Sequence, residues 1–345
     1  MLNLAAIHEA ISHAIPEREC LVFRERRLCW AEVCERTRRL GSLLRAAGLG
    51  CHRERSQLEN WESGQDHVAL YLANGNEYLE GMLGAYKARC APFNVNYRYV
   101  EEELAYLLDD ADARAVIYHA AFAPRLARIR ARLPKVRLWL QVADDSDEPL
   151  LPGALDYEKA LAEAMSAVPG DDLSPDDLYI LYTGGTTGMP KGVLWRQEEI
   201  VRGALLPPRT PATLGALVER ARRGGQVRSL PTPPFMHGAA HWAALTIWHT
   251  GGTIVVQSKP RHFDPHDVLA TAERERVTSL TIVGDAFARP LLEALAEKAY
   301  ELSALKTLSS GGAILSAATK ARLLEALPGV RIVDVLGSSE SGHQA

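Results

Sequence analysis

The chain has 345 residues, of which 47% are hydrophobic, and a formal net charge of −4 at pH 7. This length and composition predict a large buried core and about two domains, while the slightly acidic balance excludes broad electrostatic binding to nucleic acid or an anionic membrane. Five cysteines without a CxxC pair indicate neither a disulfide scaffold nor a zinc site.

The N-terminal segment lacks the basic region of a signal peptide, and no segment approaches the roughly 18 uninterrupted apolar residues of a membrane span. We therefore expect a cytoplasmic protein without a transmembrane segment. The sequence leaves the oligomeric state open.

Short β-like runs alternate with amphipathic helical stretches on both sides of residue 182, which predicts an α/β fold with parallel sheet covered by helices. Two stretches, 143–153 and 207–227, have the composition of surface linkers. In chain order, the expected elements are strand 67–73, helix 77–89, strand 91–95, helix 101–109, strand 114–119, then strand 252–257, helix 265–276, strand 279–283, helix 286–298, strand 305–309, helix 317–327 and strand 330–335.

Residues 182–192 read Tyr-Thr-Gly-Gly-Thr-Thr-Gly-Met-Pro-Lys-Gly, a composition that predicts a phosphate-binding loop. Glycine lets the backbone approach an anion, threonine adds hydroxyl donors, and Lys191 adds positive charge. The apolar run 178–182 before it predicts a buried strand, so the loop is expected to leave the end of a sheet, where α/β proteins bind ligands. The residues expected to bind the phosphate groups are Thr183, Gly184, Gly185, Thr186, Thr187, Gly188 and Lys191.

Two simpler assignments of this loop were weighed. It is not a Walker A loop, because Pro190 precedes Lys191 and Gly192 follows it. A surface loop of turn residues is the structural alternative, but eleven residues of this composition favour the phosphate-binding interpretation.

The loop resembles the signature motif of the adenylate-forming superfamily, which includes acyl-CoA synthetases, firefly luciferases and the adenylation domains of peptide synthetases. Three further segments are similar to family motifs: Ser-Ser-Gly-Gly-Ala at 309–313, Asp-Val-Leu-Gly-Ser-Ser-Glu at 334–340, and Pro-Pro-Phe-Met-His-Gly at 233–238. The sequences in and around these motifs are most similar to those of actinobacterial fatty-acyl-CoA synthetases, including those that take steroid side-chain acids.

The resemblance implies an N-terminal AMP-binding (adenylation) domain over 1–345, with two βα-layered subdomains of about 1–175 and 176–345. Such a chain would end before the family's ribose-binding motif and C-terminal lid, either as an excised domain or as a natural truncation. Residues 51–64 replace a short turn of the family, and we expect an inserted surface loop there, with a regulatory or partner role left open.

The resemblance also implies roles for individual residues in ATP-dependent activation of a carboxylic acid, with Mg²⁺ and coenzyme A as further ligands. Thr186 and Lys191 would act on the phosphates, and His237 would border the acyl pocket. Leu336 stands where the family often has a Tyr that stacks on adenine, so only apolar contact is expected there. The residues expected at the edge of the adenine are Gly311, Gly312 and Ala313. The further residues expected to bind the nucleotide are Asp334, Leu336, Gly337, Ser338 and Ser339. Ser339 is also expected to be catalytic, and Glu340 is expected to be a catalytic acid and a metal ligand.

Each single residue also has a structural interpretation. Glu340 could be a surface carboxylate, and His237 could be a buried histidine with satisfied hydrogen bonds. Trp242 and Trp248 are expected in the core, and Asp285 is expected to be the N-cap of a helix.

The expected function is activation of a hydrophobic acid, because 235–248 is almost entirely apolar and each buried CH₂ adds about 0.8 kcal/mol. A medium- to long-chain fatty acid or a steroid side-chain acid would fit. Two alternatives stay open: a non-catalytic nucleotide- or acyl-binding paralogue, and a ligase that loads a carrier protein instead of CoA.

Overall fold

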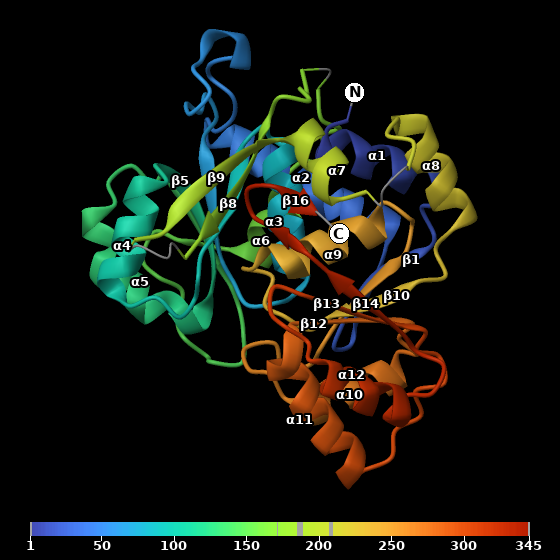
Figure 1. The fold of residues 1–345 in the computed structure, drawn as a ribbon. Coiled ribbons are helices and arrows are strands. Elements are labelled where there is room, and N and C mark those ends of the chain that lie inside the picture. Colours follow the sequence, from blue (N-terminus) through green and yellow to red (C-terminus); the bar gives the residue numbers. More distant parts are fainter. Residues whose placement is uncertain (1, 171, 185–188, 207–209, 344–345) are drawn as a thin grey trace. The chain divides into compact units, whose positions relative to one another are not determined.

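The computed structural model describes residues 2–170, 172–184, 189–206 and 210–343. The chain divides into two compact units, which are interleaved in sequence and are described separately (Figure 1). The subdomain boundary expected at 175/176 lies within the first unit. The first unit comprises Met1–Glu9, Glu32–Ala73 and Glu77–Val201, and the second comprises Ala10–Ala31, Asn74–Asn76 and Arg202–Ala345.

The first unit contains a five-stranded parallel sheet of order β4-β3-β5-β6-β7. Its central strands are apolar and buried throughout, as expected of strands covered by helices on both faces. The strands are β3 (His67–Tyr71), β4 (Ala91–Asn94), β5 (Ala113–His119), β6 (Leu138–Val142) and β7 (Leu155–Asp156). The helices mostly within this unit are α1 (Leu4–Ala14), α2 (Trp30–Ala46), α3 (Asn76–Lys87), α4 (Glu101–Asp110), α5 (Ala123–Ile129), α6 (Tyr157–Glu163) and α7 (Gln197–Ala204), with short 3-10 turns at Arg55–Gln57, Ala120–Phe122 and Arg130–Arg132.

The second unit contains a seven-stranded sheet of order β14-β13-β12-β10-β11-β1-β2, parallel except for its edge strand β2. The strands are β1 (Glu19–Phe23), β2 (Arg26–Cys29), β10 (Arg228–Pro231), β11 (Thr253–Val256), β12 (Ser279–Ile282), β13 (Thr307–Gly311) and β14 (Arg331–Val335). The helices are α8 (Leu214–Arg223), α9 (Gly238–Trp248), α10 (Pro265–Arg274), α11 (Gly284–Glu297) and α12 (Ala317–Ala326), and a small β15–β16 ladder (Gly337–Ser338, Gly342–His343) ends the described chain.

The core of the second unit lies between this sheet and the helices that follow its strands. Apolar residues of β10, β12 and β13 pack against the inward faces of α10, α11 and α12, with Leu280 and Leu308 fully buried among them. These three helices cover one face of the sheet, and α9 lies on the other (Figure 1). The carboxyl ends of the parallel strands therefore meet at one open edge of the sheet.

The α/β fold and its parallel sheets are confirmed, and every strand and helix predicted from the sequence has a counterpart. One expected linker is wrong: α8 occupies part of 207–227, because Thr213 caps the helix by accepting from the Ala216 N–H, and Leu217 and Ala221 are buried on one face. Residues 143–153 contain no helix or strand, as predicted. Trp242 and Trp248 are buried, which confirms their place in the core.

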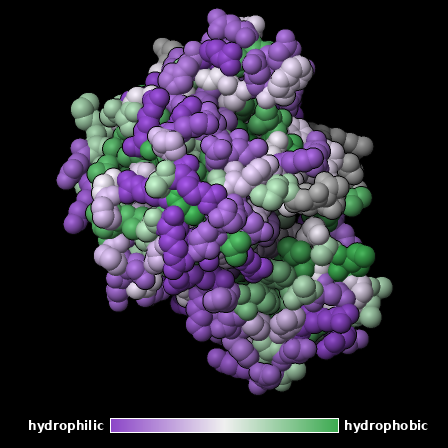
Figure 2. Space-filling model, turned by 90° about the vertical axis from the view of Figure 1, so that its left-hand side faces the viewer, coloured by the Kyte–Doolittle hydropathy of each residue, from purple (hydrophilic) through white to green (hydrophobic). Residues whose placement is uncertain are grey.

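The surface is mainly polar on the face shown in Figure 2, where apolar groups appear in small patches among hydrophilic ones. Among the described helices, none combines the length and apolar character that a membrane crossing requires. All five cysteines are unbridged, and Cys20, Cys34 and Cys90 are buried.

Candidate functional site

The predicted phosphate-binding loop connects two strands of the first unit, β8 (Leu178–Thr183) and β9 (Lys191–Arg196). These strands form an antiparallel hairpin in which Thr183 pairs with Lys191. The strand expected before the loop is confirmed, but it belongs to this two-stranded ladder and not to the parallel sheet. Gly185, Thr186, Thr187 and Gly188 lie outside the described residues, whereas Gly184 and Lys191 are exposed.

One side chain of the parallel sheet holds the hairpin by both of its polar atoms. Asn94, the last residue of β4, accepts from the Tyr182 N–H at 2.7 Å and donates to the Tyr182 carbonyl at 2.8 Å. Asn94 is buried, so water cannot replace these bonds easily. Sequence analysis missed it, because its partner is 88 residues away and no local pattern connects them.

The Tyr182 side chain fixes the hairpin from the other side. Its hydroxyl donates to Asp110 at 2.9 Å, and burial, with the nearby Asp110 carboxylate, raises its pKa, so the phenol stays neutral. A Cβ at Gly192 would lie 3.0 Å from the Tyr182 ring, tighter than ordinary contact. The glycine that follows Lys191 therefore serves ring packing as well as loop geometry.

The predicted adenine edge lies at the carboxyl ends of β13 and β14 in the second unit. Gly311 pairs with Val335, and a Cβ at Gly311 would lie 3.1 Å from the Val335 carbonyl oxygen. Gly312 has a φ of +84°, a conformation that favours glycine, and both Gly312 and Ala313 are exposed. Two predicted binding segments, 311–313 and 334–336, are thus side by side on adjacent strands.

The loop after β13 is positioned by the first turn of α11. The Gly284 N–H donates to Ser310 Oγ at 3.0 Å, and the Asp285 N–H donates to the Ile314 carbonyl at 3.0 Å. A Cβ at Gly284 would lie 2.5 Å from the Ile314 oxygen, so only glycine fits there. The N-cap prediction for Asp285 is wrong, because the helix begins one residue earlier and the carboxylate instead accepts from the Ser316 N–H at 2.9 Å.

Two large apolar side chains are exposed at this edge. Ile314 is 85% exposed and Leu336 is 62% exposed, although burying either would be favourable by about 1.5–3 kcal/mol. Asp334, in β14, forms an ion pair with Lys320 of α12. A planar apolar ligand could cover Ile314 and Leu336 without disturbing that pair.

The last motif residues follow in the β15–β16 ladder. Gly337 pairs with His343, and the hydroxyls of Ser338 and Ser341 are 2.9 Å apart. Ser339 is half-buried, and Glu340 is exposed in the turn. Within the described part of the chain, no three His, Cys, Asp or Glu side chains are grouped closely enough to form a metal site by themselves.

His237 occupies the N-cap position of α9, and its side chain is exposed and does not cap the helix. The turn before it is held by Asn74, which donates to the Pro233 carbonyl at 2.9 Å and accepts from the Phe235 N–H at 2.5 Å. His241, one turn into α9, is fully buried and bonds the Phe235 carbonyl at 2.7 Å, and burial lowers its pKa to about 4. His241 is therefore a neutral structural histidine.

Comparison with known proteins gives consistent matches over almost the whole chain. A family model described as AMP-binding enzyme matches residues 9–345. Medium-chain acyl-CoA ligase Mig of Mycobacterium avium is 48% identical, over 99% of this chain and 63% of its own length. The 3-oxocholest-4-en-26-oate--CoA ligase of Rhodococcus rhodochrous is 36% identical, over 99% of this chain and 61% of its own length.

The fold is similar to that of a solved structure, the inhibitor-bound N-terminal domain of FACL13 from Mycobacterium tuberculosis. The TM-score is 0.78 at 23% identity, covering 98% of this chain and 76% of that chain. The present chain therefore spans about 60% of the length of the two curated relatives and most of a solved N-terminal domain.

Proposed function

The chain belongs to the family of AMP-binding enzymes, and from that premise we propose that it forms the nucleotide- and acid-binding part of an AMP-forming acyl-CoA ligase. ATP, Mg²⁺ and CoA as ligands, a hydrophobic carboxylic acid as substrate and a cytoplasmic location belong to this proposal. The observation that carries it is the carboxyl edge of the second unit's sheet, where the exposed backbone of Gly312 adjoins the exposed side chains of Ile314 and Leu336.

This edge has the properties that an adenine ring requires. The absence of a side chain at Gly311 and Gly312 leaves a flat backbone edge, and planar bases bind where apolar groups flank a few polar atoms. Covering Ile314 and Leu336 with the base would remove their apolar surface from water. Leucine gives apolar contact at this position but no ring stacking.

The residues proposed for the phosphates and their metal ion are accessible. Lys191 and Glu340 are exposed, and no ion pair joins either of them to another described residue. One carboxylate suits Mg²⁺, which usually takes one or two protein carboxylates and completes its shell with phosphate oxygens and water. When bound, Mg²⁺ would supply positive charge that offsets the charge of the phosphates.

The proposed chemistry begins with attack of the substrate carboxylate on the α-phosphorus of ATP, which forms an acyl-adenylate and releases pyrophosphate. The reaction brings an anion toward a polyanion, so positioned cations and hydrogen-bond donors lower its barrier. Lys191 would neutralise phosphate charge, and the Ser339 hydroxyl would donate to the α-phosphate or the acyl carboxylate. The CoA thiol then displaces AMP to give the thioester.

A hydrophobic substrate is supported by the segment after β10. Helix α9 is apolar except for His241 and Thr246, and the two curated relatives are named for a medium-chain acid and for a steroid side-chain acid. We infer a medium- to long-chain fatty acid or a steroid side-chain acid as the substrate, with His237 at the border of the acyl pocket.

Calorimetric titration of the 345-residue chain with a non-hydrolysable octanoyl-adenylate mimic tests the proposal. We expect binding, with affinity at least about 100-fold above that of the acetyl analogue because six more methylenes are buried. Lys191→Ala should weaken binding about tenfold or more, whereas the matched variant Lys159→Ala, an exposed lysine of α6, should not. A folded chain that gives no heat at millimolar mimic would refute the site, and equal affinity for both analogues would refute the substrate class.

A second assay separates an enzyme from a binding module. Octanoate-dependent release of pyrophosphate from ATP, followed by mass spectrometry of thioesters with CoA or a carrier protein as acceptor, is expected to show the CoA thioester in the full-length protein. Adenylate binding without pyrophosphate release would identify a non-catalytic paralogue. A thioester formed only on the carrier protein would show that the carrier protein, and not CoA, is the acceptor.

A further inference from the structure

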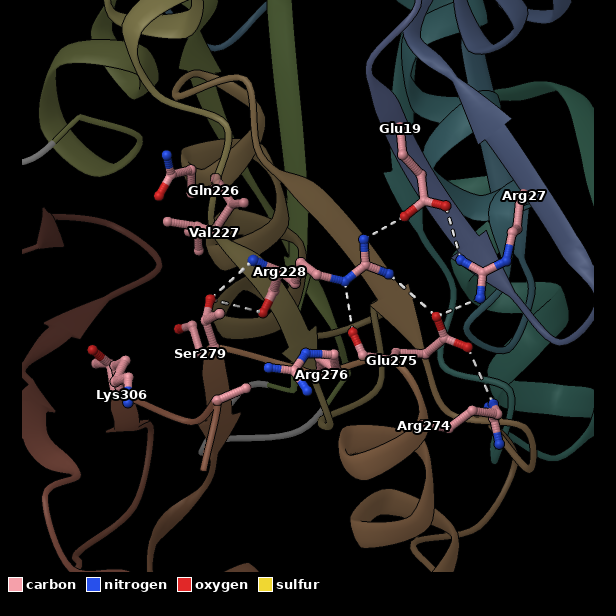
Figure 3. Close-up of a pocket in the computed structure, with 14 residues that line it drawn as sticks. Glu19, Arg27, Gln226, Val227, Arg228, Arg274, Glu275, Arg276, Ser279 and Lys306 are labelled. Atoms are coloured by element: carbon pink, nitrogen blue, oxygen red, sulfur yellow. Dashed lines mark hydrogen bonds and ion pairs between the residues drawn. The ribbon is translucent and has the colours of Figure 1, made fainter. Parts of the chain in front are cut away.

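The second unit contains a cavity of about 1060 Å³ at the amino edge of its sheet (Figure 3). Arg228, Ser279 and Thr307, which line it, are the first residues of three parallel strands, β10, β12 and β13. The candidate adenylate site lies at the carboxyl ends of the same sheet. The cavity is therefore a separate feature of the unit that the proposed function does not use.

The described lining carries an excess of positive charge. Five cationic side chains face only two carboxylates, those of Glu19 and Glu275, which leaves a surplus of three charges. A concentration of like charge is unfavourable in the free protein and attracts an anionic ligand. The five cations are Arg27, Arg228, Arg274, Arg276 and Lys306.

Both carboxylates are already engaged by arginines on one side of the cavity. Arg27 donates to Glu19 at 2.8 Å and to Glu275 at 2.7 Å. Arg228 also contacts Glu19, and it reaches the Glu275 carboxylate at 3.2 Å and the Glu275 carbonyl at 2.6 Å. Burial raises the pKa of Glu19, but the hydrogen bonds from Arg228 and Arg27 outweigh this effect and lower it, so the carboxylate stays ionised.

Two cations of the lining, Arg276 and Lys306, form no ion pair with either lining carboxylate; in Figure 3 Arg276 lies next to Glu275 near the centre of the view, and Lys306 lies at the left. Within the described chain, no hydrogen bond involves the Arg276 guanidinium, whose charge interacts with the Glu301 carboxylate outside the lining, and the Lys306 ammonium bonds only a neutral acceptor, the Ser303 carbonyl, at 2.8 Å. Between these two cations lies Ser279, whose hydroxyl could donate to the same ligand.

The backbone at Arg276 adds a second observation. Its φ of +49° places an arginine in the left-handed region just after α10, where glycine is the usual residue. A side chain in this conformation is strained relative to glycine. The fold thus holds a guanidinium in the cavity at an energetic cost, although glycine would serve the turn better.

We propose that this cavity binds a small soluble polyanion of the di- or triphosphate class, held by Arg276 and Lys306 and supported by the arginine pair Arg27 and Arg228. A guanidinium can bind a phosphate group through two parallel hydrogen bonds, and an ammonium provides an adjustable point charge. Such a ligand would neutralise the surplus charge while leaving the adenylate site open.

The test is calorimetric titration of the 345-residue chain with inorganic tripolyphosphate at low and at physiological salt. We expect binding that persists in the Lys191→Ala chain, where the proposed phosphate loop is weakened, and whose affinity falls as the salt concentration rises. Arg276→Asn, which keeps a residue that tolerates positive φ, and Lys306→Gln should each weaken binding about tenfold or more. The matched control is Arg331→Gln, since Arg331 is exposed and begins β14 at the same edge but does not line the cavity.

Further arms separate this site from other anion-binding surfaces. Saturation with the octanoyl-adenylate mimic should leave tripolyphosphate affinity unchanged, and melting temperatures should show that all variants fold. The proposal is overturned if the unaltered chain gives no heat, if Arg276→Asn and Lys306→Gln bind like the unaltered chain, or if the mimic displaces tripolyphosphate. Binding to phosphatidylglycerol vesicles without binding of tripolyphosphate would overturn it in favour of a lipid surface.

Discussion

Replacing Asn94 by alanine should release the hairpin that carries the predicted phosphate-binding loop. The substitution removes both bonds to Tyr182, at 2.7 Å and 2.8 Å, and leaves the backbone N–H and carbonyl of a half-buried residue without their partner. Each lost bond costs about 1–2 kcal/mol, so local opening of the hairpin should become easier by about 2–4 kcal/mol. In equilibrium terms this is a factor of roughly 30 to 700.

Hydrogen exchange of the native protein, followed by mass spectrometry, measures this opening directly. The backbone amides of 178–183 and 191–196 should lose protection from exchange by this factor of roughly 30 to 700, while protection of the amides of β5 in the same unit should change little. Asn94→Asp should have a smaller effect, because it keeps the acceptor for the Tyr182 N–H and loses the donor. Asn96→Ala is the matched control, since the Asn96 side chain bonds within its own turn, accepting from the Arg98 N–H at 3.0 Å and bonding the Tyr99 side chain. Unchanged protection in a folded Asn94→Ala chain would refute the assignment of Asn94 as the anchor of the hairpin.

Three further outcomes are expected. Gly311→Ala should destabilise the protein by about 1–3 kcal/mol and weaken adenylate binding, because the new Cβ would lie 3.1 Å from a carbonyl oxygen of β14. Thermal melts measure the loss of stability. The control is Gly215→Ala, which should be neutral or stabilising because nothing lies within 4 Å of the added Cβ. Because burial lowers the pKa of His241 to about 4, only the unfolded chain binds this proton between about pH 6.5 and 4, so the contribution of His241 to stability should fall by about 1.4 kcal/mol per pH unit as the pH drops through that window. Urea titrations should show a flatter pH profile of stability for His241→Gln. Leu336→Tyr should tighten binding of the adenylate mimic about three- to tenfold by adding ring stacking, and calorimetry showing weaker binding would contradict an adenine site there.

The parts of the fold that could be predicted are those encoded in short stretches of sequence. The strand–helix alternation from β3 to β5 and from β11 to β14 follows from local apolar periodicity, and the family follows from motifs of five to eleven consecutive residues. Helix α8 was missed because proline, glycine and arginine around it mark a linker, whereas its single buried face depends on tertiary packing. Local composition therefore predicted the helices and strands more reliably than the linkers between them.

The residues of the candidate site likewise divide into those predicted from a local motif and those that depend on contacts distant in sequence. Gly311 and Gly312 were predicted from the motif, and Gly312 is exposed; their role in nucleotide binding stays a prediction. Asn94 and Asn74 were missed, because each holds a backbone segment far away in sequence, 88 and 159 residues in the two cases. Such anchors lie outside the motif they support, so no spacing rule reveals them.

The place of β1 in the sheet has a consequence for biosynthesis. Leu21 of β1 pairs with Ile254 of β11, so during translation β1 waits for a partner that is made roughly 230 residues later. At a synthesis rate of about 5–20 residues per second, β1 and the edge strand β2 stay unpaired on that side for roughly 10–50 s. During this time their apolar residues and open backbone groups are exposed to aggregation. Folding of the nascent chain should thus depend on chaperone protection of β1 and β2 until β11 leaves the ribosome.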